Sequence, residues 1–169
     1  MILAALSSIV MLQAAAAPAA PDAALERLKA RAEACIQSNA AVVERNDPNL
    51  TDAANFLTDH LCANEVQAVA RYRMSAGLLA GMRNAGQFAD ADDGGEATPQ
   101  TKAIMKKQFD MYRASRIDPD TGDIIYPPGS PAAMAAGWNI MAAQAAPAPE
   151  FRALAARAVL QARQSRTGQ

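Results

Sequence analysis

The chain has 169 residues, of which 51% are apolar, and its 16 basic and 17 acidic residues give a formal net charge of -1. This length suits one domain. The net charge is near zero, so the chain does not have the excess of basic residues that is typical of a general nucleic-acid binder. The apolar content argues against a wholly disordered chain. Because 42 of the apolar residues are alanine, which favours helix formation but buries little area, we expect a helical domain with a thin core.

The N-terminal segment has the layout of an export signal. Residues 1–21 carry no charged side chain, and an apolar run there leads into a segment of alanine and proline. This pattern predicts a signal peptide over residues 1–19, cleaved after Ala16 or Ala19 because proline directly after the cleaved bond is disfavoured. We therefore expect a periplasmic or extracellular protein after Sec-type export. The alternative is an uncleaved segment that tethers the protein to the membrane.

A helical hairpin is expected over residues 22–86. Asp22 can cap a first helix, the turn-forming cluster at 46–49 ends it, and Thr51 can cap a second helix. Apolar residues recur at steps of three and four on both sides of the turn. The residues expected to face the partner helix are Leu25, Leu28, Ala32, Cys35, Asn39 and Val42 in the first helix, and Ala54, Leu57, Leu61, Ala68, Tyr72 and Leu79 in the second.

The two cysteines, Cys35 and Cys62, are placed symmetrically about that turn. Residues equidistant from the turn of an antiparallel hairpin lie at the same height, so the spacing predicts a disulfide. Export would place both thiols in an oxidising compartment, where the bond persists. A disulfide that closes a loop of this length stabilises a fold by about 3–4 kcal/mol in the chain-entropy model. Without export, two separate buried thiols are the alternative.

The remaining chain predicts two or three further helices, for a single domain over 22–165 with four to five helices and little or no β-structure. Thr98 and Pro99 form a cap-then-proline start for a helix over 98–117, followed by a turn-rich loop over 118–129 that could hold a tiny hairpin. Helices over 130–146, starting at Ser130-Pro131, and over 150–165 complete the bundle, and residues 166–169 are expected to fray. The buried side of the 98–117 helix should include Met105, Phe109 and Tyr112.

Carboxylates gather in two loops, at 90–96 and at Asp118, Asp120 and Asp123. Oxygen-rich loops suit Ca²⁺, but Gly122 occupies the third ligand position of an EF-hand count and no closing glutamate follows, so we expect solvated turns rather than a metal site. The same acids could form the acid and base pair of a hydrolase, although such loops offer no apolar pocket to raise a pKa. One histidine and two cysteines are too few for a conventional zinc site in one chain.

The sequence contains no GxSxG, SxxK, HExxH, P-loop or CxxCH motif, so nothing in it supports an enzyme. Trp138, the single tryptophan, is expected either to fill the centre of the bundle, which we favour, or to mark a contact surface. We therefore expect a non-enzymatic exported protein that acts by contact with another envelope or secreted protein, without a cofactor or nucleic acid and with membrane contact only through an uncleaved N-terminal segment. The alternatives are an exported hydrolase that uses the loop carboxylates, and a helical bundle that binds a small ligand or a metal.

Overall fold

The computed structural model describes residues 22–89 and 98–168, except for the side chains of 86–89 and 132–135. Within these residues the predicted all-α fold is confirmed, with one two-stranded sheet in addition. The predicted signal peptide and the acidic cluster at 90–96 lie outside the described residues. The elements are α1 (Ala23–Asn46), α2 (Leu50–Phe56), a π-helical turn η1 (Leu57–Leu61), α3 (Ala63–Ala89), α4 (Pro99–Ala114), β1 (Arg116–Ile117), β2 (Ile124–Ile125), α5 (Ala132–Ala143) and α6 (Pro149–Thr167).

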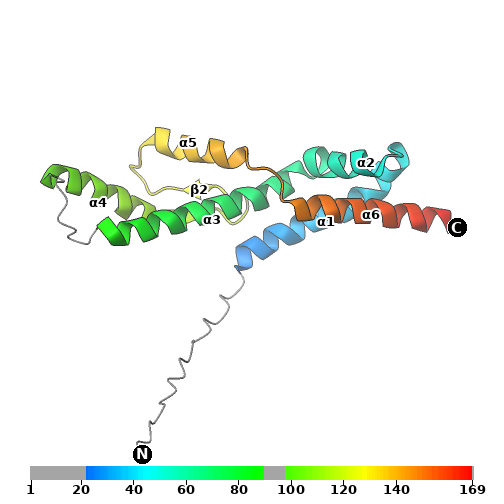
Figure 1. Cartoon of the computed structure of the whole chain (residues 1–169), viewed down its shortest axis with the longest axis horizontal. Coiled ribbons are helices and arrows are strands. Elements are labelled where there is room, and N and C mark those ends of the chain that lie inside the picture. The colour runs from blue at the N-terminus through cyan, green and yellow to red at the C-terminus, as the bar shows by residue number, and fades with distance from the viewer. Residues whose placement is uncertain (1–21, 90–97, 169) are drawn as a thin grey trace, which may run out of the picture.

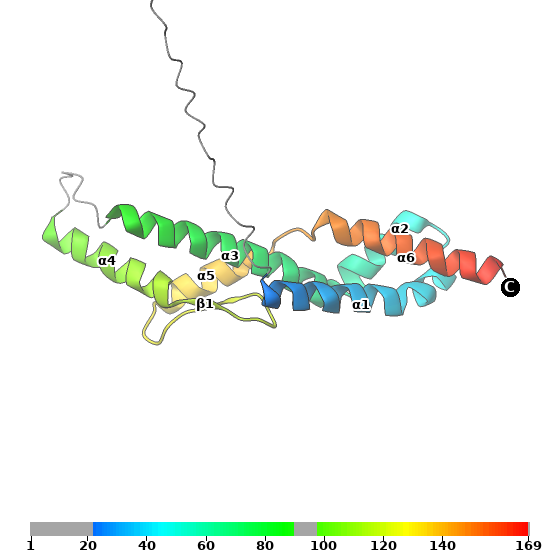
Figure 2. The same ribbon diagram turned by 90° about the horizontal axis from the view of Figure 1, so that it is seen from below.

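The molecule is elongated, and α3 runs through both of its halves (Figures 1 and 2). At one end, α1 packs against both α6 and the first part of α3, and α2 packs against α6. We call residues 22–72 and 149–168 the disulfide half. At the other end, α4, α5 and the β1–β2 hairpin lie along the second part of α3, and we call residues 76–89 and 98–143 the distal half. No helix in either half is long and apolar enough to cross a membrane.

Two helices begin where the sequence predicts. The Asp22 carboxylate accepts hydrogen bonds from the backbone amides of Ala24 and Leu25, at 3.0 and 3.4 Å, and so caps α1. The hydroxyl of Thr98 accepts from the amide of Thr101 at 3.2 Å, and Pro99 occupies the first turn of α4.

Other boundaries differ from the prediction. Asn49, rather than Thr51, caps α2 with its side-chain oxygen. The predicted cap at Ser130 is wrong, because α5 starts at Ala132 after Pro131 with no side-chain cap. The predicted helix over 98–117 ends at Ala114. Helix α6 continues to Thr167, so residues 166 and 167, which were expected to fray, are helical.

The second helix of the predicted hairpin is interrupted by the π turn η1. The amide of Cys62 donates to the carbonyl of Leu57, five residues earlier, at 2.8 Å. A π turn accommodates one more residue than an α turn, so Cys62, not Leu61, lies in line with Leu57 on the buried face. Cys62 is accordingly fully buried, while Leu61 is 45% exposed. The prediction that Leu61 faces the core is therefore wrong, and the extra residue is the reason.

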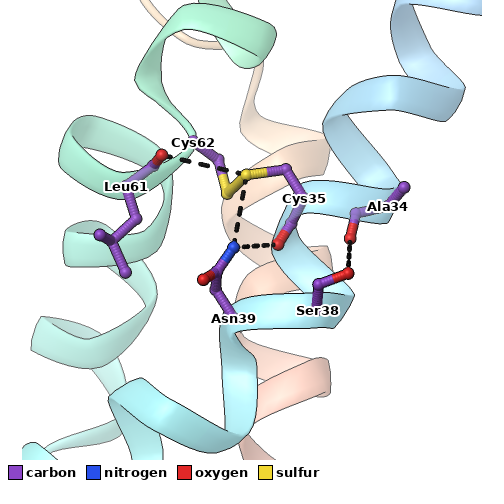
Figure 3. The surroundings of a disulfide bond; sticks show 6 residues. All are labelled: Ala34, Cys35, Ser38, Asn39, Leu61 and Cys62. Atoms are coloured by element: carbon purple, nitrogen blue, oxygen red, sulfur yellow. Dashed lines mark hydrogen bonds between the residues drawn. A yellow bond between two sulfur atoms is a disulfide. The ribbon is translucent and has the colours of Figure 1, made fainter.

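The predicted disulfide is confirmed. Cys35 of α1 and Cys62 are joined across the two segments of the hairpin, with their Cα atoms 5.8 Å apart (Figure 3), a usual separation for such a bond. The side-chain amide of Asn39 donates to the carbonyl of Cys35 at 2.9 Å and lies 3.7 Å from its sulfur. Asn39, one turn after Cys35 in α1, thus helps to position the cysteine for the disulfide.

The buried face of α1 differs in part from the predicted stripe. Leu28 and Ala32 are buried as expected, but farther along the helix Ile36 and Val43 are buried while Val42 is 46% exposed. The reason is that α6, from the far end of the chain, packs along α1 beside α3 (Figure 1). A helix covered by two neighbours buries a wider face than the one that a hairpin alone requires.

Burial is unequal between the two halves. The main cluster of buried residues lies in the disulfide half, and its members come from α1, α2, η1, α6 and the first part of α3 together with Cys62. Among the side chains that the structure describes, the distal half has a cluster of three buried apolar residues: Leu79, Tyr112 and Ile124. The main cluster consists of Leu28, Ala32, Ile36, Ala40, Val43, Ala53, Ala54, Leu57, Cys62, Val66, Ala68, Val69, Tyr72, Phe151, Ala155, Ala158 and Val159.

The loop after α4 forms the small hairpin that the sequence allowed for. Arg116 pairs with Ile125, and Ile117 pairs with Ile124, in antiparallel register. Gly122 adopts a positive φ of 77°, and a Cβ atom there would lie 2.5 Å from the carbonyl oxygen of Ala68 in α3. The hairpin tip therefore needs glycine both for its turn and for its close approach to α3.

Candidate functional site

An apolar groove lies on the distal half, between α4 and residues 127–131. Its volume is about 470 Å³, which places it in the range of sites that hold a ligand or a few side chains of a partner. The residues that line it are Ile104, Lys107, Gln108, Asp110, Met111 and Ala114 from α4 and Pro127, Pro128, Gly129, Ser130 and Pro131 from the loop before α5.

The α4 wall follows from the helical repeat. Ile104, Gln108 and Met111 are spaced by four and three residues, so they share one face, and the lining from Ile104 to Ala114 extends for about 15 Å. Ile104 is 62% exposed. The sequence predicted burial for the neighbouring stripe, but there Met105 is 40% exposed and Phe109 only half-buried. Since α4 packs mainly on α3, the rest of its apolar surface faces the groove or solvent.

The opposite wall is a proline-rich loop with restricted backbone freedom. Three of its five residues are proline, whose φ is fixed by the ring, and the Ser130 hydroxyl donates to the carbonyl of Pro127 at 2.7 Å. The ring of Tyr126, just before the loop, meets the ring of Tyr112 of α4 edge-to-face, with 6.5 Å between the centroids. These contacts hold the loop at a set distance from α4, so the groove is preformed.

Helix α5 continues the apolar surface beyond the loop. It contains no charged residue, and it is attached to the hairpin by Asn139, whose side-chain oxygen accepts from the amide of Ile124 at 3.2 Å. On the outward side, Ile140 is 60% and Met141 53% exposed. Trp138 is half-buried in this helix and belongs to neither buried cluster, so it does not fill the centre of the bundle.

The structure gives the acids of the 118–123 turn local roles. Asp118 accepts hydrogen bonds from the amides of Asp120 and Thr121, at 2.8 and 3.1 Å. Asp120 pairs with Arg31 at 3.3 Å, and Asp123 lies 3.7 Å from the guanidinium of Arg71.

Within residues 22–89 and 98–168, no three histidine, cysteine, aspartate or glutamate side chains are grouped so that they could hold a metal ion. Asp118, Asp120 and Asp123 are therefore not brought together as a ligand set, and none of them lines the groove. His60 is exposed on η1, with its ring 5.2 Å from that of Phe56.

A buried carboxylate, which no sequence pattern predicted, joins α1 to α6. The side chain of Glu44 is 2% exposed and accepts from Arg166 at 2.7 Å and from Arg163 at 3.3 Å. Arg163 also donates to the carbonyl of Pro48 at 3.0 Å. The partners are more than a hundred residues apart along the chain, so no local pattern could have paired them.

A second polar contact fixes the start of α1 on α3. The Tyr72 hydroxyl donates to Asp22 at 2.6 Å. Burial, followed by this hydrogen bond, raises the pKa of Tyr72 to about 12. The same hydrogen bond is the main reason that the pKa of Asp22 lies below its usual value of 3.8. The first described residue of the chain is thus bound to the middle of the molecule.

Comparison of this chain with protein-family models, with curated proteins and with solved structures finds no match.

Proposed function

We propose that the chain is an exported, non-enzymatic protein that binds an amphipathic helix of another secreted or cell-envelope protein in the groove between α4 and residues 127–131. The observation that carries this proposal is the groove itself, an apolar channel along about three turns of α4. A helix laid in a hydrophobic groove is a common mode of peptide recognition.

The lining suits such an occupant. Ile104, Met111 and the prolines supply apolar area in the groove, and the burial of apolar area favours association. Lys107 and Asp110 bring one charge of each sign to the lining, which fits a partner with mixed polar flanks better than a surface of one charge. A concave, preformed site also avoids much of the entropy cost of ordering a loop on binding.

Two observations support export. The uncharged segment over residues 1–21, with its apolar run and alanine-rich end, has the layout of a signal peptide, and the Cys35–Cys62 disulfide is a bond that persists in oxidising compartments. Cleavage after Ala16 or Ala19 would leave a short lead before Asp22, so the cap of α1 and its contact with Tyr72 would be retained.

The groove is tested by site-specific photocrosslinking in cells from position 108, where Gln108 lines the groove. We expect one discrete adduct, which Ile104→Glu abolishes because it places a charge in the apolar channel. Leu160→Glu is the matched control, since Leu160 is 42% exposed on α6, outside the groove. An adduct that survives Ile104→Glu, or that Leu160→Glu removes equally, contradicts the proposal.

Export is tested separately by mass spectrometry of the protein recovered from fractionated cells. We expect a mature N-terminus at residue 17 or 20, and a mass that shows Cys35 and Cys62 joined. An intact N-terminus in the membrane fraction would favour the tethered form, whereas reduced, full-length protein in the cytosol would overturn export.

A further inference from the structure

A second cavity lies away from the groove, between the start of α1, the middle of α3 and strand β1. Its volume is about 340 Å³. One face of α3 forms its floor, and the residue spacing of three and four keeps these side chains in line. The lining residues are Asp22, Tyr72, Ala76, Leu79, Ala80, Arg83, Ser115, Arg116 and Ile117.

Two arginines, Arg83 and Arg116, line this cavity. A guanidinium nitrogen of Arg83 donates to the backbone carbonyl of Ser115 at 3.0 Å, and Arg116 is the next residue along the chain. The bond to Ser115 holds one edge of the Arg83 guanidinium and leaves its other N–H groups available. Two positive charges therefore line one cavity, and an anion bound between them would be attracted by both.

No carboxylate among the described residues pairs with either arginine. The only acid in the lining is Asp22, and both of its oxygens are already engaged, one with the amides at the start of α1 and the other with Tyr72. The cavity therefore has an excess of positive charge at the end formed by Arg83 and Arg116.

We propose that this cavity binds the phosphate group of a small organic phosphate. The planar guanidinium fork matches the oxygens of a phosphate, and charge-assisted pairs of this kind are about twice as strong as neutral hydrogen bonds. Ala76, Leu79 and Ile117 line the same cavity and offer apolar contact to the organic part of the molecule. The proposal is independent of the groove and of its helical partner.

The test is isothermal titration of the oxidised protein with glycerol 3-phosphate. Wild-type protein should bind, and both Arg116→Gln and Arg83→Gln should weaken the affinity by at least about tenfold, which is the usual value of one charge-assisted hydrogen bond. Arg157→Gln is the matched control, because Arg157 is exposed on α6 away from the cavity. Because Arg116 is exposed and makes no described ion pair, its variant keeps the fold and isolates the loss of the cation.

Vesicles distinguish the source of the phosphate. If the group belongs to a lipid headgroup, the protein sediments with phosphatidic acid vesicles, not with phosphatidylcholine vesicles, and Arg116→Gln releases it. If it belongs to a free metabolite, only the soluble probe binds. Absence of wild-type binding up to about 10 mM in both formats, or equal binding by the wild type and Arg116→Gln, would overturn the proposal.

Discussion

The two halves of the molecule share α3 but are held together by different means. The disulfide half has a contiguous cluster of buried residues, a disulfide and the buried Glu44 between two arginines. In contrast, the apolar cluster described in the distal half consists of three buried residues, Leu79, Tyr112 and Ile124. The candidate groove lies entirely on the less buried half. Stability is thus concentrated in one half, which leaves apolar surface on the other available for contact.

The largest expected effect comes from the core of the disulfide half. Phe151 is 2% exposed and belongs to the main cluster, so Phe151→Ala should lower the free energy of unfolding by about 3–5 kcal/mol. Met105→Ala in α4 is the comparison, because Met105 is 40% exposed, and it should cost less than about 1 kcal/mol. Urea unfolding followed by circular dichroism measures the free energy of unfolding of both variants. An equal loss of free energy in the two would contradict the unequal burial of the two halves.

Removal of the disulfide should have the next largest effect. Cys35 and Cys62 are 27 residues apart, so Cys35→Ala with Cys62→Ala should cost about 3–4 kcal/mol. Trp138 lies in the distal half, so its fluorescence reports that half, whereas circular dichroism reports all helices. We expect the circular dichroism midpoint to fall more than the fluorescence midpoint, and an equal shift of both would contradict the concentration of stability in the disulfide half.

The attachment of the hairpin to α3 can be tested with two glycines. Gly122 and Gly129 both have positive φ, at 77° and 83°, but only at Gly122 would a Cβ atom collide with the backbone of α3. Gly129→Ala should cost about 1–2 kcal/mol for its backbone conformation alone. Gly122→Ala should cost at least about 2 kcal/mol more, because the hairpin must move away. Similar melting temperatures for the two variants would show that the hairpin does not rest on α3 as described.

A smaller effect is expected where the halves meet, at Tyr72. Tyr72→Phe removes the hydrogen bond to Asp22 and should cost about 1 kcal/mol at pH 7. Because folding raises the pKa of Tyr72 from 10.0 to about 12, its contribution is complete below pH 10 and is lost as the pH rises through 12. The lowered pKa of Asp22 gives a contribution that is present above pH 3.8 and lost as the pH falls.

Chemical unfolding at several pH values checks this prediction. The wild type should lose its advantage over Tyr72→Phe at both extremes of pH. A free-energy difference between the two proteins that stays constant from pH 3 to pH 12 would contradict the proposed contact.

The smallest effect is expected at Tyr126. Its hydroxyl is buried with no hydrogen-bond partner among the described residues, and burial is the first cause that raises its pKa to about 12. Tyr126→Phe should therefore leave stability within about 0.5 kcal/mol of the wild type or raise it slightly, because no bond is lost. A loss comparable to that of Tyr72→Phe, in the same unfolding assay, would show that the hydroxyl has a partner.

The features that the sequence predicted correctly depend on residues that are close together in the chain, or on symmetry about a single turn. The cap at Asp22, the start at Thr98-Pro99 and the Cys35–Cys62 register each need only neighbouring residues or the position of one turn. The π turn escaped prediction because its extra residue has no sequence signature, and it moves Leu61 off the buried face.

The candidate groove could be predicted less well from the sequence than these local features. The groove needs α4 and residues 127–131 to be placed side by side, which only tertiary packing decides. The available signal in the sequence consisted of two apolar residues next to the predicted stripe, Ile104 and Met111, and of the prolines at 127, 128 and 131. No such signal pointed to the contact of Glu44 with Arg163 and Arg166, because these residues lie far apart in the sequence.

Hydrogen exchange of the oxidised protein, read by mass spectrometry, tests the unequal stability of the halves most directly. We expect backbone amides in α1, α6 and the first part of α3 to exchange only through global unfolding, and amides in α4 and α5 to exchange at least about tenfold faster, through local opening. Equal protection of α4 and α6 would contradict this expectation.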